Sequence, residues 1–373
     1  MKQKNSFSGQ IGFVFAAAGS AVGVGNLWRF PYLAAKDGGG LFLLIYLVLV
    51  LTVGFVLLTT DIAIGRKTGK SAIYAYESMK KKWKFLGVIT FLVPVLIMTY
   101  YAVIGGWILR YIVIYLTSSG KQAVADDCFT AFISSPSSVW YGLIFMLLTA
   151  LIVYNGVEEG IERVSKFIMP VLLIMVIGIA IFSLTLKTTL DDGTVRTGLQ
   201  GLKVYMKPDL TGITVGRFLQ ITLDAMSQLF FSLSVSMGIM ITYGSYVKKD
   251  VDLNKAVSQI EIMDTGVAFL AGVMIIPAVF VFSGLDGMSA GPGLMFVSLP
   301  KVFYSMGTVG RVIGILFFVL AGFAALTSCI SVLESITANC MELFHTERKK
   351  TTRVLSVIYL IATAVIALGY SIF

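Results

Sequence analysis

The sequence has little charge, a single histidine and three cysteines. Only 13% of its 373 residues are charged, about half the share in an average soluble domain. Three scattered cysteines exclude a disulfide framework and a cysteine metal site, and the lone His345 lies in a charged loop, which excludes histidine-based metal or acid–base chemistry. With no catalytic constellation in the sequence, we do not expect an enzyme.

Hydrophobic residues are what the chain has in excess. They make up 57% of the sequence, with a mean hydropathy of +0.88, as is typical of a polytopic membrane protein. The net charge of +9 is then better explained by loops that face anionic lipid than by a nucleic-acid partner. Nine segments are candidates to cross the bilayer: 11–35, 41–64, 85–116, 139–154, 167–186, 215–246, 255–283, 310–343 and 354–372.

The loops predict how the chain is oriented. Lysine and arginine gather in the loops on the side of the N-terminus, such as 66–84, and are sparser in 117–138 and 187–214. By the positive-inside rule the N-terminus is cytoplasmic, in a multi-pass protein of the cell (plasma) membrane. Loop 155–166 is short and charged, and we expect it to be cytoplasmic. The stretch 284–301 is too apolar for a free loop, so we expect it to fold back into the outer mouth.

The first membrane segment carries residues that a regular helix disfavours. Gly19, Gly23 and Gly25 weaken the helix, and Asn26 places an amide at membrane depth. Backbone that leaves a helix within lipid must be satisfied by protein, water or a bound molecule. We therefore predict that this helix is broken and that its freed carbonyls and amides form a binding site.

The sixth segment carries a similar interruption. Ser232, Ser234 and Ser236 alternate ahead of Gly238, and they can converge only if the backbone is unwound there. Paired interruptions in two halves of a membrane protein indicate an inverted-repeat transporter with its site at mid-membrane. The alternative is close helix packing through small residues, with serines bonded to the preceding turn.

Several motifs together resemble the neurotransmitter:sodium symporter family, and its bacterial amino-acid transporters in particular. They are residues 20–32 (SAVGVGNLWRFPY), 38–40 (GGG), 100–101 (YY), 160–163 (GIER), 230–234 (FFSLS), 242–243 (TY) and 324–328 (AALTS). The resemblance covers essentially the whole chain. It implies the all-α leucine-transporter fold, with broken helices 1 and 6.

The same resemblance predicts how the chain is divided. Residues 1–186 would form a first repeat of helices 1–5, 187–214 an extracellular loop, and 215–373 an incomplete second repeat of helices 6–9. The family has eleven or twelve helices, whereas this sequence stops in or just after helix 9. We therefore expect a C-terminally truncated chain that lacks helix 10.

Two sodium sites are implied by the resemblance. The first would use the Ala21 carbonyl, Asn26, Ser232 and an acid of helix 7, for which we choose Asp264. The second would use the Gly19, Val22 and Ala324 carbonyls with the hydroxyls of Thr327 and Ser328. The alternatives are a helix-end charge at the interface for Asp264, and an ordinary helix–helix hydrogen bond for Thr327 and Ser328.

A zwitterionic substrate site is implied beside the first sodium. The amides of Val24 and Gly25, at a helix N-terminus, and the Tyr101 hydroxyl would bind a carboxylate. An ammonium would bind the carbonyls of Ala21, Phe231 and Ser232, together with Ser234. The side chain would lie against an apolar wall made by Ile97, Ser236, Met237 and Val332. This wall favours a hydrophobic or aromatic L-amino acid.

Gates on both sides of this site complete the prediction. Arg29 and Gln228 would form the outer gate, with Phe231 as a lid. Lys4 and Glu342 are candidates for an inner ionic latch. Gly160 and Pro170 would let the cytoplasmic end of helix 5 unwind, the alternative being an ordinary helix start with a tolerated proline.

The predicted function is sodium-coupled symport of this amino acid by alternating access. Asp264 would supply the negative charge that chloride supplies in some relatives, so we expect chloride independence. The alternatives are a proton-coupled amino-acid transporter and a membrane protein that binds an amino acid without transporting it. The predicted partners are the amino acid, sodium ions and the lipid bilayer, and the oligomeric state is left open.

Overall fold

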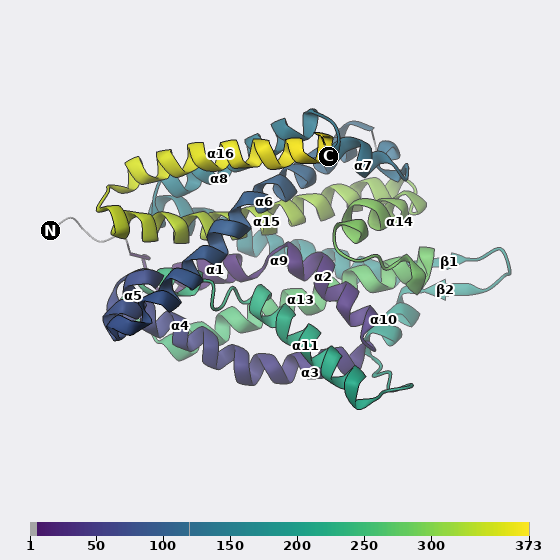
Figure 1. Ribbon diagram of the computed structural model, residues 1–373. Helices are drawn as coiled ribbons and strands as arrows, with labels where there is room; N and C mark the ends of the chain where they lie inside the picture. Colours follow the sequence, from purple (N-terminus) through teal and green to yellow (C-terminus); the bar gives the residue numbers. More distant parts are fainter. Residues whose placement is uncertain (1–5, 119, 373) are drawn as a thin grey trace.

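The protein is a bundle of long helices with one small hairpin in the part of the chain that the structure describes (Figure 1). The computed structural model describes residues 6–118 and 120–372, without the side chains of 371 and 372. Seven helical stretches there are long and apolar enough to cross a membrane: Gly40–Thr68, Lys81–Ser118, Ser137–Tyr154, Val157–Thr185, Leu253–Ser283, Thr308–Phe344 and Arg348–Tyr370.

The first membrane segment is broken, as predicted. Helices α1 (Gln10–Ala21) and α2 (Val24–Lys36) meet at 53° and together are long enough for an eighth span. Val22 and Gly23, between them, have extended backbone. The break frees the carbonyls at the end of α1 and the amides at the start of α2 at one point in the bundle.

The sixth segment is unwound at its centre. Helix α11 (Val215–Ser232) ends where the serines begin, and a short α12 (Ile239–Gly244) follows. Ser234, Ser236 and Gly238 all have positive φ, at 52°, 60° and 73°. Neither α11 nor α12 counts as a regular span, so the described chain has seven spans, or eight with the bent pair α1–α2, and the predicted count of about nine membrane helices is not confirmed exactly. The broken-helix prediction for this segment is nevertheless confirmed.

The remaining helices of the first half surround these breaks. α3 (Gly40–Leu49), a π-helical turn (Val50–Gly54) and α4 (Phe55–Thr68) form one span. The next elements are α5 (Ala72–Met79), a 3₁₀ turn (Lys81–Trp83), α6 (Lys84–Ser118), a 3₁₀ turn (Lys121–Val124), α7 (Cys128–Ile133) and α8 (Ser137–Tyr154).

Helix 5 begins ten residues earlier than the sequence predicts. A π-helical turn over Val157–Glu162 continues directly into α9 (Arg163–Thr185). Val157, Gly160 and Ile161 are buried, so the stretch expected to be a charged loop is held as helix by its apolar face.

The predicted extracellular loop 187–214 is ordered. Strands β1 (Lys187–Thr189) and β2 (Val195–Thr197) pair antiparallel, with Lys187 opposite Thr197. Thr197 and Gln200 cap the following α10 (Gly198–Met206). In Figure 1 this hairpin projects from the end of the bundle opposite the N-terminus.

The second half contains two long buried helices. The elements are α13 (Leu253–Ser283), a 3₁₀ turn (Leu285–Gly287), a π-helical turn (Leu294–Ser298), α14 (Leu299–Ser305), α15 (Thr308–Phe344) and α16 (Arg348–Ile372). Phe296 is 1% exposed, and its ring lies 6.4 Å from that of Trp28 on α2. The apolar stretch therefore folds back onto the bundle, as expected.

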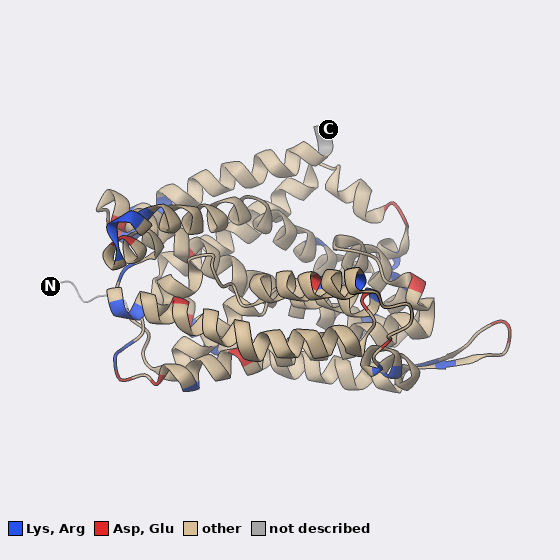
Figure 2. Ribbon diagram, turned by 60° about the horizontal axis from the view of Figure 1, so that its bottom comes forward, with Lys and Arg blue, Asp and Glu red and all other residues tan. Residues whose placement is uncertain are grey.

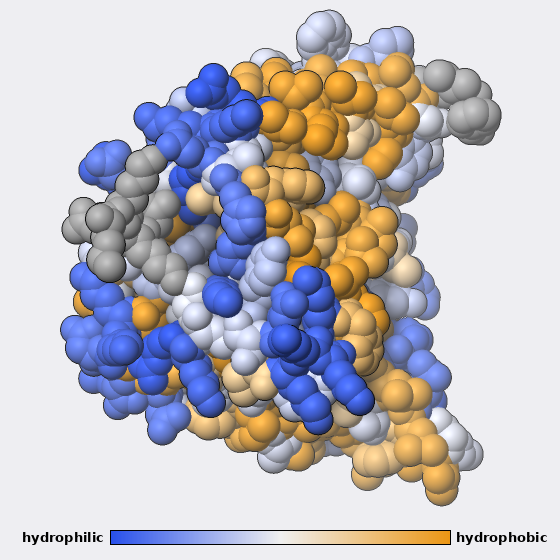
Figure 3. Space-filling model, turned by 60° about the vertical axis from the view of Figure 1, so that its left-hand side comes forward, coloured by the Kyte–Doolittle hydropathy of each residue, from blue (hydrophilic) through white to orange (hydrophobic). Residues whose placement is uncertain are grey.

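Charge and hydropathy follow the pattern of a membrane protein. Lysine and arginine gather towards the two ends of the bundle, with mostly uncharged helix between them (Figure 2). Seen from the end that carries the N-terminal segment, hydrophilic residues cover much of the surface and hydrophobic surface begins beside them (Figure 3). The apolar band between the two ends has the distribution that a bilayer requires.

Candidate ion and substrate site

The first predicted sodium site brings together three polar side chains from three helices. The Asn26 amide nitrogen donates to Ser232 Oγ at 3.0 Å and to Asp264 Oδ1 at 2.8 Å. Ser232 Oγ in turn donates to Asp264 Oδ2 at 2.9 Å. All three residues are 1% exposed or less. A buried carboxylate, a hydroxyl and an amide are oxygen ligands of the types that suit a hard cation.

Local backbone geometry positions this cluster. Gly23 has no side chain, and its amide donates to Asn26 Oδ1 at 3.1 Å, which fixes the rotation of the amide group. Ser232 is the last residue of α11, so the helix ends where its hydroxyl is needed. Asp264 lies inside α13 and is fully buried, so the alternative of a helix-end charge at the interface is wrong.

The second predicted sodium site lies between α1 and α15. A β-carbon on Gly19 would stand 3.2 Å from the Thr327 β-carbon, so the two helices pack closely at this point. Ser328 Oγ donates to the Ser20 carbonyl at 3.2 Å, and Thr327 Oγ1 donates to the Ala324 carbonyl at 3.2 Å. Val22 is the C-cap of α1, with its own carbonyl beyond the last helical residue. The predicted ligands of this site therefore lie on the two facing helices.

A small cavity lies between the two breaks, bounded by α6 and α15. Ala21, Ile97, Tyr101, Phe231, Ser234, Met237 and Val332 line it, as predicted, and so do Ser20, Gly23, Asn26, Ile239, Ser328 and Ser331. Its volume is about 30 Å³, room for a water molecule or two but not for an amino acid. Side chains such as Phe231 or Met237 must move before a substrate can enter.

Four of the predicted substrate residues do not line this cavity. Val24 and Gly25 begin α2, and a β-carbon on Gly25 would come within 2.9 Å of the Phe231 ring. Ser232 belongs to the first sodium cluster. Ser236 is exposed, and its amide donates to Asp61 Oδ2 of α4 at 2.8 Å. Ile239, not Ser236, therefore joins Met237 in the wall.

Sequence reasoning missed a set of hydroxyls at one end of the cavity. Ser20 Oγ donates to Ser331 Oγ at 2.7 Å and lies 3.4 Å from Ser234 Oγ. Ser331 follows Ser328 by one helical turn, so it lies on the same face of α15. That spacing was a signal that could have revealed it. These serines tie α1, α15 and the unwound segment together beside the cavity.

The predicted outer gate is in contact. Arg29 donates from Nη1 to Gln228 Oε1 at 3.2 Å and from Nη2 to Ser227 Oγ at 2.9 Å. Further out, Lys36 pairs with Asp224 at 3.1 Å and Arg217 with Asp37 at 2.9 Å. Burial raises the pKa of Asp37, while Lys36 and Arg217 act against that rise. These contacts join α2 to α11 above the cavity.

Only one of the two residues of the predicted inner latch, Glu342, lies in the part of the chain that the structure describes. Lys4 lies outside the described residues, so its pairing stays a prediction. The Glu342 carboxylate accepts from the Ser71 amide at 3.0 Å and from its hydroxyl at 2.7 Å.

Two other contacts on the inner side were not foreseen. Glu334 of α15 pairs with Arg348 at 2.6 Å and accepts from the Tyr246 hydroxyl at 2.6 Å. Glu162, at the start of helix 5, accepts from the Ser8 amide at 2.8 Å and from the Ser8 hydroxyl. Both carboxylates are almost fully buried.

The predicted hinge residues of helix 5 lie in a π-helical turn and in the helix that follows it. Gly160 belongs to the π-helical turn, where a β-carbon would collide with the Ile152 carbonyl. Pro170 lies inside α9, next to Met169, whose sulfur would be 3.5 Å from a β-carbon on Gly19. The hinge role of Gly160 and Pro170 stays a prediction, beside the alternative of an ordinary helix start with a tolerated proline.

Comparisons with known proteins agree with this geometry. The model of the sodium:neurotransmitter symporter family matches residues 4–135 and 121–371. An uncharacterized sodium-dependent transporter of Bacillus subtilis is 38% identical over 92% of this chain and 74% of its own length. The human sodium- and chloride-dependent taurine transporter is 25% identical over 98% of this chain and 66% of its own.

A solved structure gives the same fold. The crystal structure of MhsT in complex with L-phenylalanine superposes with a TM-score of 0.84 at 37% identity. The match covers 99% of this chain and 82% of that one.

Proposed function

Because this chain belongs to the sodium:neurotransmitter symporter family, we propose that it carries a hydrophobic or aromatic L-amino acid into the cell together with sodium. The observation that carries the proposal is the convergence of Asn26, Ser232 and Asp264 beside a cavity between two broken helices. No bond in the substrate is made or broken.

The buried carboxylate of Asp264 is the argument that the site binds a sodium ion. A buried carboxylate without a counter-ion is costly, whereas a bound cation repays that cost. Asp264 is 0% exposed, and it accepts hydrogen bonds only from neutral groups, those of Asn26 and Ser232, in the described chain. A sodium ion among these oxygens and the Ala21 carbonyl would be neutralised by Asp264 itself. We therefore propose that no chloride is needed.

A second sodium would connect helix 1 to helix 8. The Gly19, Val22 and Ala324 carbonyls and the Thr327 and Ser328 hydroxyls are its proposed ligands, and none of them is charged. This ion would hold α1 against α15 while it is bound. Its departure would free α1, and the region around Gly160 and Pro170 would then admit water.

The lining of the cavity is the argument for the substrate. Ile97, Met237, Ile239 and Val332 offer apolar contacts to a side chain, and methionine adapts its shape readily. The amides at the start of α2 and the Tyr101 hydroxyl would bind the carboxylate. The likeness to a structure that holds L-phenylalanine favours an aromatic or large apolar side chain.

The test is binding of radiolabelled amino acids to the purified chain, in sodium and in potassium at equal ionic strength. We expect phenylalanine or leucine to bind in sodium only, with the same affinity in chloride and in gluconate. Proteoliposomes with a sodium gradient would then test for uptake. Equal binding in potassium would refute sodium coupling, and uptake that follows a pH gradient would favour the proton-coupled alternative. Binding without uptake would favour the non-transporting one.

A further inference from the structure

A basic turn joins the short helix α5 to the membrane-spanning helix α6. The segment 66–84, which contains this turn, has seven lysines and arginines but a single acidic residue, Glu77. Four exposed lysines lie within the turn or directly beside it: Lys80, Lys81, Lys82 and Lys84. In Figure 1, α5 lies at the end of the bundle that carries the N-terminus. We call residues 80–84 the basic turn.

Most of the positive charge of the basic turn has no acidic partner in the described chain. Lys84 pairs with Glu77 at 3.2 Å. No carboxylate among the described residues pairs with Lys80, Lys81 or Lys82, and Lys80 instead lies 5.8 Å from the centre of the Trp83 ring. The basic turn therefore presents three positive charges that a ligand could neutralise.

The start of α6 places these charges at the edge of the membrane. The stretch Lys81–Ser118 is long and apolar enough to cross a bilayer, so its first turn lies at the level of the lipid headgroups. This placement follows from the continuity of the chain into α6, and it does not depend on which faces of the bundle are covered. Trp83 is 42% exposed, and tryptophan is enriched at this depth. Clustered lysines next to a membrane helix attract anionic lipids.

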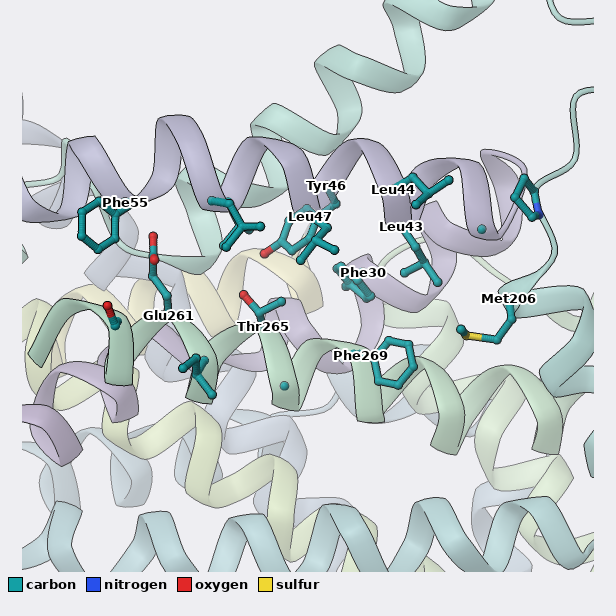
Figure 4. A pocket seen from close by; sticks show the side chains of 17 residues that line it. Phe30, Leu43, Leu44, Tyr46, Leu47, Phe55, Met206, Glu261, Thr265 and Phe269 are labelled. Carbon is teal, nitrogen blue, oxygen red and sulfur yellow. The ribbon is translucent and has the colours of Figure 1, made fainter. Parts of the chain in front are cut away.

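The largest hollow of the described chain offers nothing comparable to an anion. It lies between the span α3–α4 and α13, and the side chains that line it are mostly apolar (Figure 4). Glu261 is the one charged residue among the described residues that line it, and a carboxylate repels a phosphate. An anionic headgroup is therefore attracted to the basic turn and not to this hollow.

The other end of α5 is fixed against the broken sixth segment. The Ile73 amide of α5 donates to Asn339 Oδ1 of α15 at 3.1 Å. A β-carbon on Gly238, which follows the unwound serines, would stand 3.0 Å from the Ala72 β-carbon. Helix α5 therefore connects the basic turn to α15 and to the unwound segment.

We propose that the basic turn binds the phosphate headgroup of an anionic phospholipid, in the leaflet on the side of the N-terminus. The bound lipid would hold α5 in place against the unwound segment. Each ammonium group has three N–H donors for phosphate oxygens. A lysine at a membrane surface strengthens the binding of anionic lipid by about fivefold. This surface is separate from the ion and substrate site and does not depend on the proposed function.

The test measures how the basic turn chooses between two lipids. In a Trp140→Phe background, Trp83 is the only tryptophan of the described chain with an exposed side chain. The purified chain is reconstituted in phosphatidylcholine with rising amounts of brominated phosphatidylglycerol or brominated phosphatidylcholine, and quenching of the tryptophan fluorescence is followed. We expect a preference for phosphatidylglycerol of at least about fivefold, which falls as salt is added. Equal quenching by the two lipids would overturn the proposal.

Variants locate the preference on the basic turn. The triple variant Lys80→Gln, Lys81→Gln and Lys82→Gln removes the unpaired charges and should abolish the preference. The matched control removes three exposed lysines at the opposite end of the bundle and should keep it: Lys187→Gln, Lys203→Gln and Lys207→Gln. A preference that survives the first triple variant would refute the site. Loss in both would show a response to net charge alone, which also overturns it.

Inorganic phosphate separates a lipid from a free anion as the ligand. Phosphate added to the unsubstituted basic turn should leave the quenching the same as chloride does at equal ionic strength. If phosphate relieves the quenching and chloride does not, the turn binds a free anion and the lipid assignment is wrong.

Hydrogen exchange of the unmodified chain tests the effect on α5 and covers the case in which a variant does not fold. In nanodiscs of phosphatidylglycerol, the amides of Ala72–Met79 should exchange several-fold more slowly than in nanodiscs of phosphatidylcholine. The amides of the β1–β2 hairpin, at the opposite end, should exchange equally in both. Equal exchange of α5 in the two lipids would refute the proposal that the lipid holds this helix in place.

Discussion

Asp264 is the residue on which the electrostatics of the proposed first sodium site depend. It is completely buried, and its partners Asn26 and Ser232 can offer hydrogen bonds but no charge. Such a carboxylate destabilises the folded protein when no cation is present and stabilises it when a cation is bound. Stability of the protein should therefore report directly on sodium.

Asp264→Asn should separate these two effects. Removing the charge should raise the melting temperature measured in potassium, because the buried carboxylate is no longer unpaired. The extra stabilisation that sodium gives by binding the native state should shrink by several degrees. Thermal unfolding in matched sodium and potassium buffers measures both. An unchanged sodium-dependent shift in this variant would show that Asp264 is not a ligand.

Glu162 shows how an element can be held by a residue far away in the sequence. It begins helix 5, yet it receives the amide and hydroxyl of Ser8 and lies against Gly12 of α1. Lys166 completes the arrangement by pairing with the same carboxylate. The inner half of helix 1 cannot move outward unless these contacts break.

Glu162→Gln should therefore loosen α1. Hydrogen bonds to a charged acceptor contribute about 1.5–3 kcal/mol each, so losing the charge should speed amide exchange in Gln10–Ala21 at least tenfold. Hydrogen–deuterium exchange followed by mass spectrometry measures this rate. Glu158→Gln is the matched control, because Glu158 lies in the same turn but is exposed. Equal exchange in the two variants would contradict the role given to Glu162.

The pair Glu334–Arg348 joins α15 to α16 in the same way. The Glu334 side chain is 0% exposed and that of Arg348 is 11% exposed. Breaking a buried pair from one side costs about 3–5 kcal/mol, because the remaining charge is left without a partner. Glu334→Gln should consequently lower the melting temperature by several degrees.

The control for this prediction is the double variant. Glu334→Gln with Arg348→Gln removes both charges, and it should be more stable than Glu334→Gln alone. Thermal unfolding of the three proteins in the same detergent gives the comparison. A double variant less stable than the single one would show that the pair acts through packing rather than charge.

A structural element can be predicted from the sequence when the residues that determine it lie nearby in the chain. The two helix breaks were predictable, because glycines and serines disfavour helix locally. The helical start at Val157–Glu162 was not, because three glutamates there are typical of a loop, and Ser8, the partner of the buried Glu162, lies 154 residues away. Ser236 was misplaced for the same reason, since Asp61 of α4 fixes its direction.

The candidate site was predicted mainly through family resemblance. Asn26, Ser232 and Asp264 are brought together as expected, although their roles as ligands stay predictions. The serine cluster of Ser20 and Ser331 was missed, because a hydroxyl on a buried helix has no sequence signal beyond spacing.

At the scale of the whole molecule, the orientation in the membrane stays a prediction that labelling can test. In a Cys128→Ser background, Asp191→Cys at the hairpin should react with an impermeant maleimide applied to intact cells. Lys350→Cys, at the opposite end, should react only after the membrane is opened. The converse pattern would show that the N-terminus is outside.

The buried aspartate has a consequence for the electrical work of the whole cycle. If Asp264, which stays with the protein, replaces a chloride that would otherwise travel with the cargo, nothing offsets the charge of the sodium ions. Two such charges crossing a potential of 100 mV gain about 4.6 kcal/mol, which is more than a thousandfold in concentration ratio. Because of a single carboxylate, uptake would then carry an inward electric current. Accumulation of the amino acid would depend on the membrane voltage as well as on the sodium gradient.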